Sequence, residues 1–74
     1  MDKWQKELLE ALIECGVSMG VLMAVGSVIK TKESVGLMTR RLMEEVDNNS
    51  KEITDGLVLQ ILTDLMKEAT AQAE

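Results

Sequence analysis

The chain has 74 residues, which limits it to a single domain, expected to span residues 1–74. Cys15 is its only cysteine and histidine is absent, so an intrachain disulfide is excluded, and no metal or cofactor site is indicated. The net charge of −5 disfavours general affinity for nucleic acid or for anionic lipid.

A domain of this size buries only about 60% of the surface of its unfolded chain, so its core is marginal. Hydrophobic residues make up 46% of the composition, but small domains without disulfides or metals usually gain stability by association. We therefore expect oligomerisation or binding to a protein partner. A lone cysteine suits a reducing compartment, and the first residues lack the features of a signal peptide, so the expected location is the cytoplasm.

Proline, phenylalanine and tyrosine are absent and helix-forming residues dominate. This composition predicts an all-α fold, a compact bundle of four short helices. The first helix is expected over residues 2–15, with Asp2 as its N-cap. Trp4, Leu8 and Leu12 then form an apolar stripe at helical spacing.

Residues 15–29 form an uncharged run that is apolar nearly all round. Gly16 can take the left-handed conformation that ends the first helix, and Ser18 is the expected N-cap of a second helix that continues to residue 29 or 30. The run is shorter than the ~20 residues that span a bilayer, so we expect this helix at the centre of the bundle. Gly20 and Gly26 lower helix stability, which indicates another backbone packed closely against them.

Thr31 is the expected N-cap of the third helix, with Glu33 in the first turn, where an acid is favourable to the helix dipole. The inward-facing residues of this helix are apolar and recur at helical spacing: Val35, Met38, Leu42 and Val46. Residues 47–50, with the sequence Asp-Asn-Asn-Ser, are predicted to form a turn.

The fourth helix is expected to begin after Thr54, its N-cap. Asp55 then lies in the first turn, where it interacts favourably with the helix dipole. Leu57 and Leu59 are expected to be exposed beside the main apolar face of this helix. That is more apolar surface than one small bundle needs, which again favours a dimer or a partner.

The predicted function is self-association or docking on a protein partner through apolar, Met-rich helix faces. Methionine is common on adaptable binding surfaces, and tryptophan often anchors interfaces. The residues expected to contact the partner are Trp4, Leu57, Leu59 and Met66. Histidine and tyrosine are absent, and no motif contains a pair of carboxylates suited to general acid–base catalysis. We therefore expect a protein that is not an enzyme.

A second interpretation is a small DNA-associated regulator. Residues 12–25 have the spacing of a helix-turn-helix corner, with the turn at residues 16–18. The second helix of this corner offers Met19 and Met23, which cannot read base edges. Phosphate contacts would come from the basic stretch at residues 30–41. Its cations are Lys30, Lys32, Arg40 and Arg41.

The order of caps and helices also suggests a resemblance. Gly16-Val17-Ser18 precedes a hydrophobic helix, Lys30-Thr31-Lys32-Glu33 precedes a helix with a Met/Leu stripe, and Thr54-Asp55 caps the last helix. In this order the chain resembles, over most of its length, a group of short uncharacterised helical proteins of Gram-positive bacteria. The resemblance implies a bacterial or phage origin and no particular activity.

Overall fold

The computed structural model describes residues 3–73, and the side chains of residues 3–70. Within these residues the chain forms four α-helices and no strand. The helices are α1 (Lys3–Glu14), α2 (Met19–Val28), α3 (Lys32–Asn49) and α4 (Asp55–Ala73). The predicted all-α fold with four helices is confirmed. Asp2, the N-cap expected for the first helix, lies outside the described residues.

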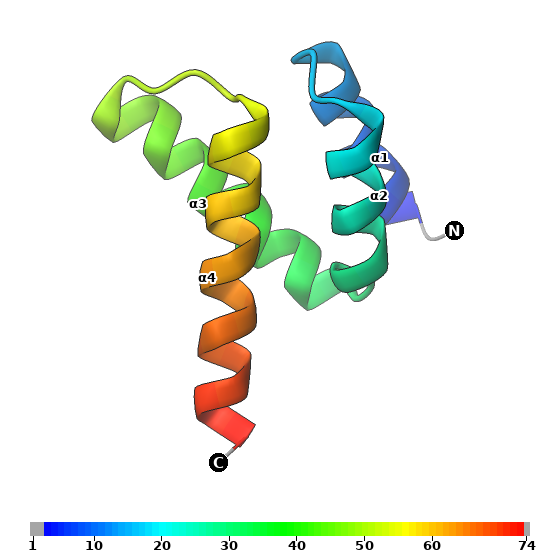
Figure 1. The fold of residues 1–74 in the computed structure, drawn as a ribbon, viewed down its shortest axis with the longest axis vertical. Helices are drawn as coiled ribbons and strands as arrows, with labels where there is room; N and C mark the ends of the chain where they lie inside the picture. Colours follow the sequence, from blue (N-terminus) through cyan, green and yellow to red (C-terminus); the bar gives the residue numbers. More distant parts are fainter. Residues whose placement is uncertain (1–2, 74) are drawn as a thin grey trace.

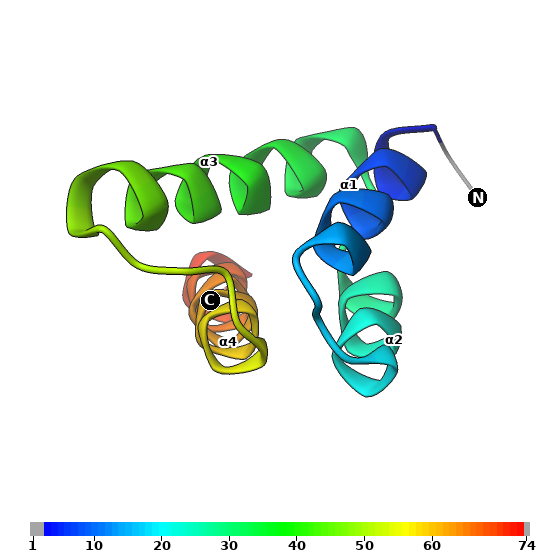
Figure 2. The ribbon, with the colours of Figure 1, turned by 90° about the horizontal axis from the view of Figure 1, so that it is seen from above.

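The helices form two layers (Figure 1, Figure 2). α1 packs against α2 and α3, and α4 packs against the same two helices. α1 and α2 run antiparallel to each other, whereas α3 crosses α4 steeply. Because one helix with its side chains is about 10–12 Å across, two layers account for the shortest extent of the molecule, 19 Å.

The core is one cluster of aliphatic side chains to which all four helices contribute. Val25, Met38 and Val58 are completely buried. The other members of the cluster are Leu8, Leu12, Val17, Val21, Leu22, Ile29, Leu42, Leu57, Ile61 and Leu62. Among the described residues no polar or charged residue is buried. Apolar burial, at about 1.5–3 kcal/mol for each large side chain, therefore holds the helices together.

Three of the predicted helix boundaries are confirmed by their hydrogen bonds or backbone angles. At the start of α3, the Ser34 backbone N–H donates to Thr31 Oγ1 and the Thr31 N–H donates to Ser34 Oγ, both over 3.0 Å. At the start of α4, the Leu57 N–H donates to Thr54 Oγ1 over 3.2 Å. Gly16, which follows α1, has a φ of +85°, a conformation that favours glycine.

The start of α2 is held by α4. Ser18 is the N-cap, as predicted, but its side chain makes no capping hydrogen bond. Its backbone N–H instead donates to Oδ1 of Asp55, the first residue of α4, over 2.8 Å. Leu57, one turn into α4, is only 7% exposed. The prediction that Leu57 is exposed for partner binding is wrong, because Leu57 packs in the core cluster.

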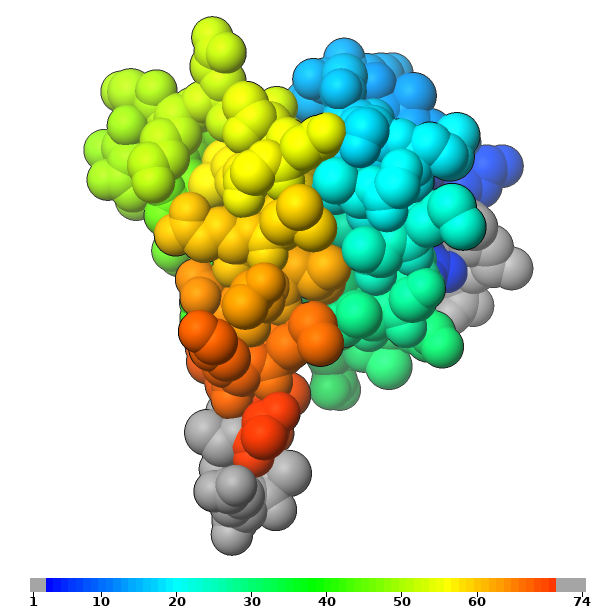
Figure 3. All heavy atoms as spheres, viewed as in Figure 1, coloured from blue at the N-terminus to red at the C-terminus, as the bar shows by residue number. Residues whose placement is uncertain are grey.

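α2 lies at the edge of the bundle, so its predicted central position is wrong. One face is buried in the core, but Met19 and Met23 on the other face are 70% and 67% exposed. Because every helix packs against only two others, none is surrounded. A Cβ atom added at Gly20 or Gly26 would meet no neighbouring segment within 4 Å, so the expected close packing of another backbone is not found either. Figure 3 shows α2 and α4 meeting along a seam on this side of the molecule.

α3 continues through most of the predicted turn at residues 47–50. Residues 47–49 are helical, and only Ser50 takes the left-handed conformation, with a φ of 54°. The Glu45 carboxylate accepts a hydrogen bond from Asn49 Nδ2 over 3.3 Å and pairs with Lys51 Nζ at 3.1 Å. These contacts stabilise the last turn of α3, and for this reason the turn prediction fails except at its last residue.

Candidate docking pocket between α1 and α3

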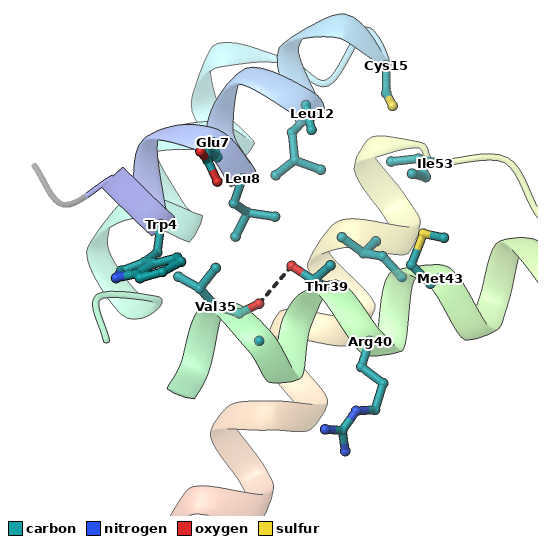
Figure 4. A pocket seen from close by; sticks show the side chains of 13 residues that line it. Trp4, Glu7, Leu8, Leu12, Cys15, Val35, Thr39, Arg40, Met43 and Ile53 are labelled. Atoms are coloured by element: carbon teal, nitrogen blue, oxygen red, sulfur yellow. Dashed lines mark hydrogen bonds between the residues drawn. The ribbon is translucent and has the colours of Figure 1, made fainter. Parts of the chain in front are cut away.

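A pocket of about 550 Å³ lies between α1 and α3 (Figure 4). α1 contributes Trp4, Glu7, Leu8, Ala11 and Leu12, and Cys15 follows directly after the end of α1. α3 contributes Val35, Gly36, Thr39, Arg40, Leu42 and Met43. Ile53, in the connection between α3 and α4, closes one end. The α1 residues recur every three or four positions, so they share one face of that helix.

The floor of this pocket is the outer surface of the core. Leu8, Leu12 and Leu42 are 7%, 1% and 4% exposed and belong to the core cluster. Val35 and Ile53 are half-buried and pack against that cluster. Since these side chains are held from behind by close packing, the floor is preformed.

Small side chains account for the open space above the floor. Gly36 lies inside α3, where glycine costs about 1 kcal/mol relative to alanine. A Cβ atom at Gly36 would meet nothing within 4 Å, so packing within the chain does not require glycine there. Ala11, on the facing helix, is also small and exposed.

Polar groups lie on the rim of the pocket and not on its floor. The Thr39 hydroxyl donates to the Val35 carbonyl oxygen within α3 over 2.8 Å (Figure 4), so its hydrogen is already used. Glu7 and Arg40 belong to the two facing helices, and both are exposed. Neither forms an ion pair with the described part of the chain. The pocket therefore offers an apolar floor between one acidic and one basic side chain.

Trp4 lies at one end of the pocket and is 43% exposed. Lys32 Nζ is 4.6 Å from the centroid of its ring, a cation–π contact worth about 0.5–1 kcal/mol at an exposed site. This contact orients the indole at the pocket edge. Trp4 and Lys32, which sequence analysis assigned to two different surfaces, are neighbours in the structure.

The structure separates the four residues predicted to bind a partner. Trp4 lines the pocket, and Leu57 is buried in the core. Leu59 and Met66 are 42% and 48% exposed, but they lie on α4 and do not line the pocket. The predicted four-residue surface does not exist as one patch.

The four basic residues of the alternative interpretation also take different positions. Arg41 Nη2 contacts both carboxylate oxygens of Glu68, each over 2.7 Å, and joins α3 to α4. The hydrogen bond and the charge of Glu68 raise the pKa of Arg41 above its ordinary value. Arg40 lines the pocket, Lys32 contacts Trp4 and Lys30 lies exposed between α2 and α3. Two of the four cations thus already contact side chains of their own chain.

Sequence reasoning did not predict the pocket, and the roles of Ala11, Cys15, Gly36 and Met43 in it were missed. One signal was available: Gly36 interrupts a segment that otherwise favours a helix, and no turn explains it. The pairing of this position with Ala11 could not be inferred, because it depends on which helices pack together.

Comparison of the chain with family models, with curated proteins and with solved structures finds no match. Among the described residues, no helix combines the length and the apolar character that crossing a membrane requires. Within the same residues, no three Cys, Asp or Glu side chains group as metal ligands would.

Proposed function

We propose that this protein is not an enzyme but a small docking protein, which binds the apolar face of a helix in the pocket between α1 and α3. The observation that supports this best is the pocket itself, whose apolar floor is continuous with the core. The half-exposed Trp4 and Met43 flank it. Buried aromatic anchors dominate interface energetics, and methionine adapts to irregular partners. The cytoplasm is the proposed location, since it suits the exposed, unpaired Cys15.

A helix suits this pocket better than a small molecule does. The volume of about 550 Å³ falls within the range of small-molecule sites, but such sites also converge a few polar groups on the ligand. Here the Thr39 hydroxyl is already bonded within its own helix, and Glu7 and Arg40 are exposed side chains on the two facing helices. An amphipathic helix laid in a groove places its apolar stripe on the floor and its polar residues at the rim.

Two single residues of the chain report on the pocket and make the proposal testable. Trp4 is the only tryptophan and Cys15 the only cysteine, and both line the pocket (Figure 4). A panel of synthetic amphipathic helices with a Leu/Met stripe and without tryptophan or cysteine, of both net charges, should shift the Trp4 emission to shorter wavelength. The same peptides should slow alkylation of Cys15 by iodoacetamide.

The matched variants are Gly36→Leu, which fills the pocket, and Gly20→Leu, which adds the same side chain on the exposed side of α2. Gly36→Leu should abolish both signals, and Gly20→Leu should leave them intact. If no peptide of the panel changes either signal, or if both variants respond alike, helix docking in this pocket is wrong. Far-UV circular dichroism of each variant checks that it is folded.

A further inference from the structure

The rim of the pocket is complementary to itself. Glu7 stands on the α1 side and Arg40 on the α3 side, and neither is paired within the described residues. If two copies meet face to face about a two-fold axis that runs along the pocket, α1 of one copy lies over α3 of the other. In such an isologous interface each contact occurs twice, so the wall that carries Glu7 in each copy faces the wall that carries Arg40 in the other.

The charge distribution of the whole chain favours the same arrangement. Residues 3–43, which include every residue that lines the pocket except Ile53, contain six Lys and Arg against four Glu, whereas residues 44–74 contain two Lys against eight acids. Pairing through α1 and residues 32–43 of α3 therefore keeps most of the acidic residues of each copy away from the contact. Pairing through α4 would bring two such acidic parts together and is disfavoured.

The shape of the pocket supplies room for the apolar part of the contact. Met43 is 52% exposed at the pocket edge, and its flexible side chain can enter an irregular space. In the two-fold arrangement it faces the wall that contains Ala11 in the other copy, where little side-chain volume is present. A protein–protein interface of standard size buries about 800 Å² on each partner. For this protein that would be roughly one sixth of the accessible surface of one copy, which is 5098 Å².

We propose that the helix docked in this pocket belongs to a second copy of the chain, and that the protein is a symmetric dimer in which Glu7 and Arg40 pair across the two-fold axis. This inference rests on the proposed docking function and names its partner.

Charge reversal tests the pairing. Glu7→Arg produces a copy with two basic rims, and Arg40→Glu produces a copy with two acidic rims. Each variant alone should dimerise about tenfold more weakly than the wild type, or worse, because like charges face each other. An equimolar mixture of the two should form a heterodimer, since each rim then meets its opposite, and the double variant should dimerise as the wild type does. Sedimentation velocity and native mass spectrometry measure these species.

Glu10→Arg on α1 and Lys67→Glu on α4 are the matched controls, because they make the same kinds of charge change outside the pocket. Neither should alter dimerisation. A wild type that stays monomeric up to about 1 mM overturns the dimer, and so does a mixture that fails to form the heterodimer. Peptide-induced changes at Trp4 and Cys15 would then still support docking, whereas a dimer in which Trp4 emission and Cys15 alkylation are the same as in the diluted monomer would contradict the pocket as the docking site.

Discussion

α3 meets its two neighbours in opposite ways. Its junction with α4 is closed: Arg41 pairs with Glu68, and the completely buried Met38 and Val58 lie on these two helices. Its junction with α1 stays open where Gly36 lines the pocket. On one side of α3 large side chains close the contact with α4, and on the other side a glycine leaves the contact with α1 accessible. The junction of α3 with α1 is thus open because of the residues on that side of α3, and not because the bundle as a whole is poorly packed.

The largest difference between the two sides should appear when a methionine is truncated on each. Met38→Ala removes a completely buried side chain and should lower the free energy of unfolding by about 2–4 kcal/mol. Met43→Ala truncates a side chain that is 52% exposed and should change the free energy of unfolding by no more than about 0.5 kcal/mol. Urea unfolding followed by circular dichroism, at concentrations where the protein is monomeric, measures both. Equal losses would mean that the α1–α3 side is as tightly packed as the core.

Two glycine substitutions with a smaller effect should show whether docking can change independently of stability. Gly36→Ala and Gly20→Ala each replace a glycine inside a helix with open space around the new Cβ atom. Each should raise the free energy of unfolding by up to about 1 kcal/mol. Only Gly36→Ala should also weaken docking, measured by peptide titration against Trp4 fluorescence or by the dimer dissociation constant. If Gly36→Ala gains stability and docks as well as the wild type, the glycine has no role in the pocket.

The smallest effect is expected at the ion pair that joins α3 to α4. Arg41→Gln should lower the thermal midpoint slightly at low ionic strength, and the difference should shrink in about 1 M salt, because exposed pairs are weak and screened. Arg40→Gln is the control, since Arg40 forms no ion pair with the described residues. A loss that persists in high salt would show that Arg41 acts through packing of its aliphatic part.

The helices themselves could be predicted because their signals are local. Thr31 and Thr54 cap α3 and α4 through hydrogen bonds to residues three positions on, and Gly16 ends α1 with a positive φ. The turn prediction failed at residues 47–49 because the Glu45 side chain stabilises the last turn of α3, although these residue types usually form turns. Trp4 was predicted to contact a partner and is 43% exposed in the structure, but its contact with Lys32 was not foreseen.

The sequence by itself determined the helical class, the number of helices and most of their ends, since caps and apolar spacing act within a few residues. Only the tertiary structure decided which apolar residues are covered. Leu57 is buried because it packs in the core cluster to which all four helices contribute, and the pocket exists because Ala11 and Gly36 come from helices that pack together. Contacts between distant residues depend on how helices are arranged, and helical periodicity carries no information about that arrangement.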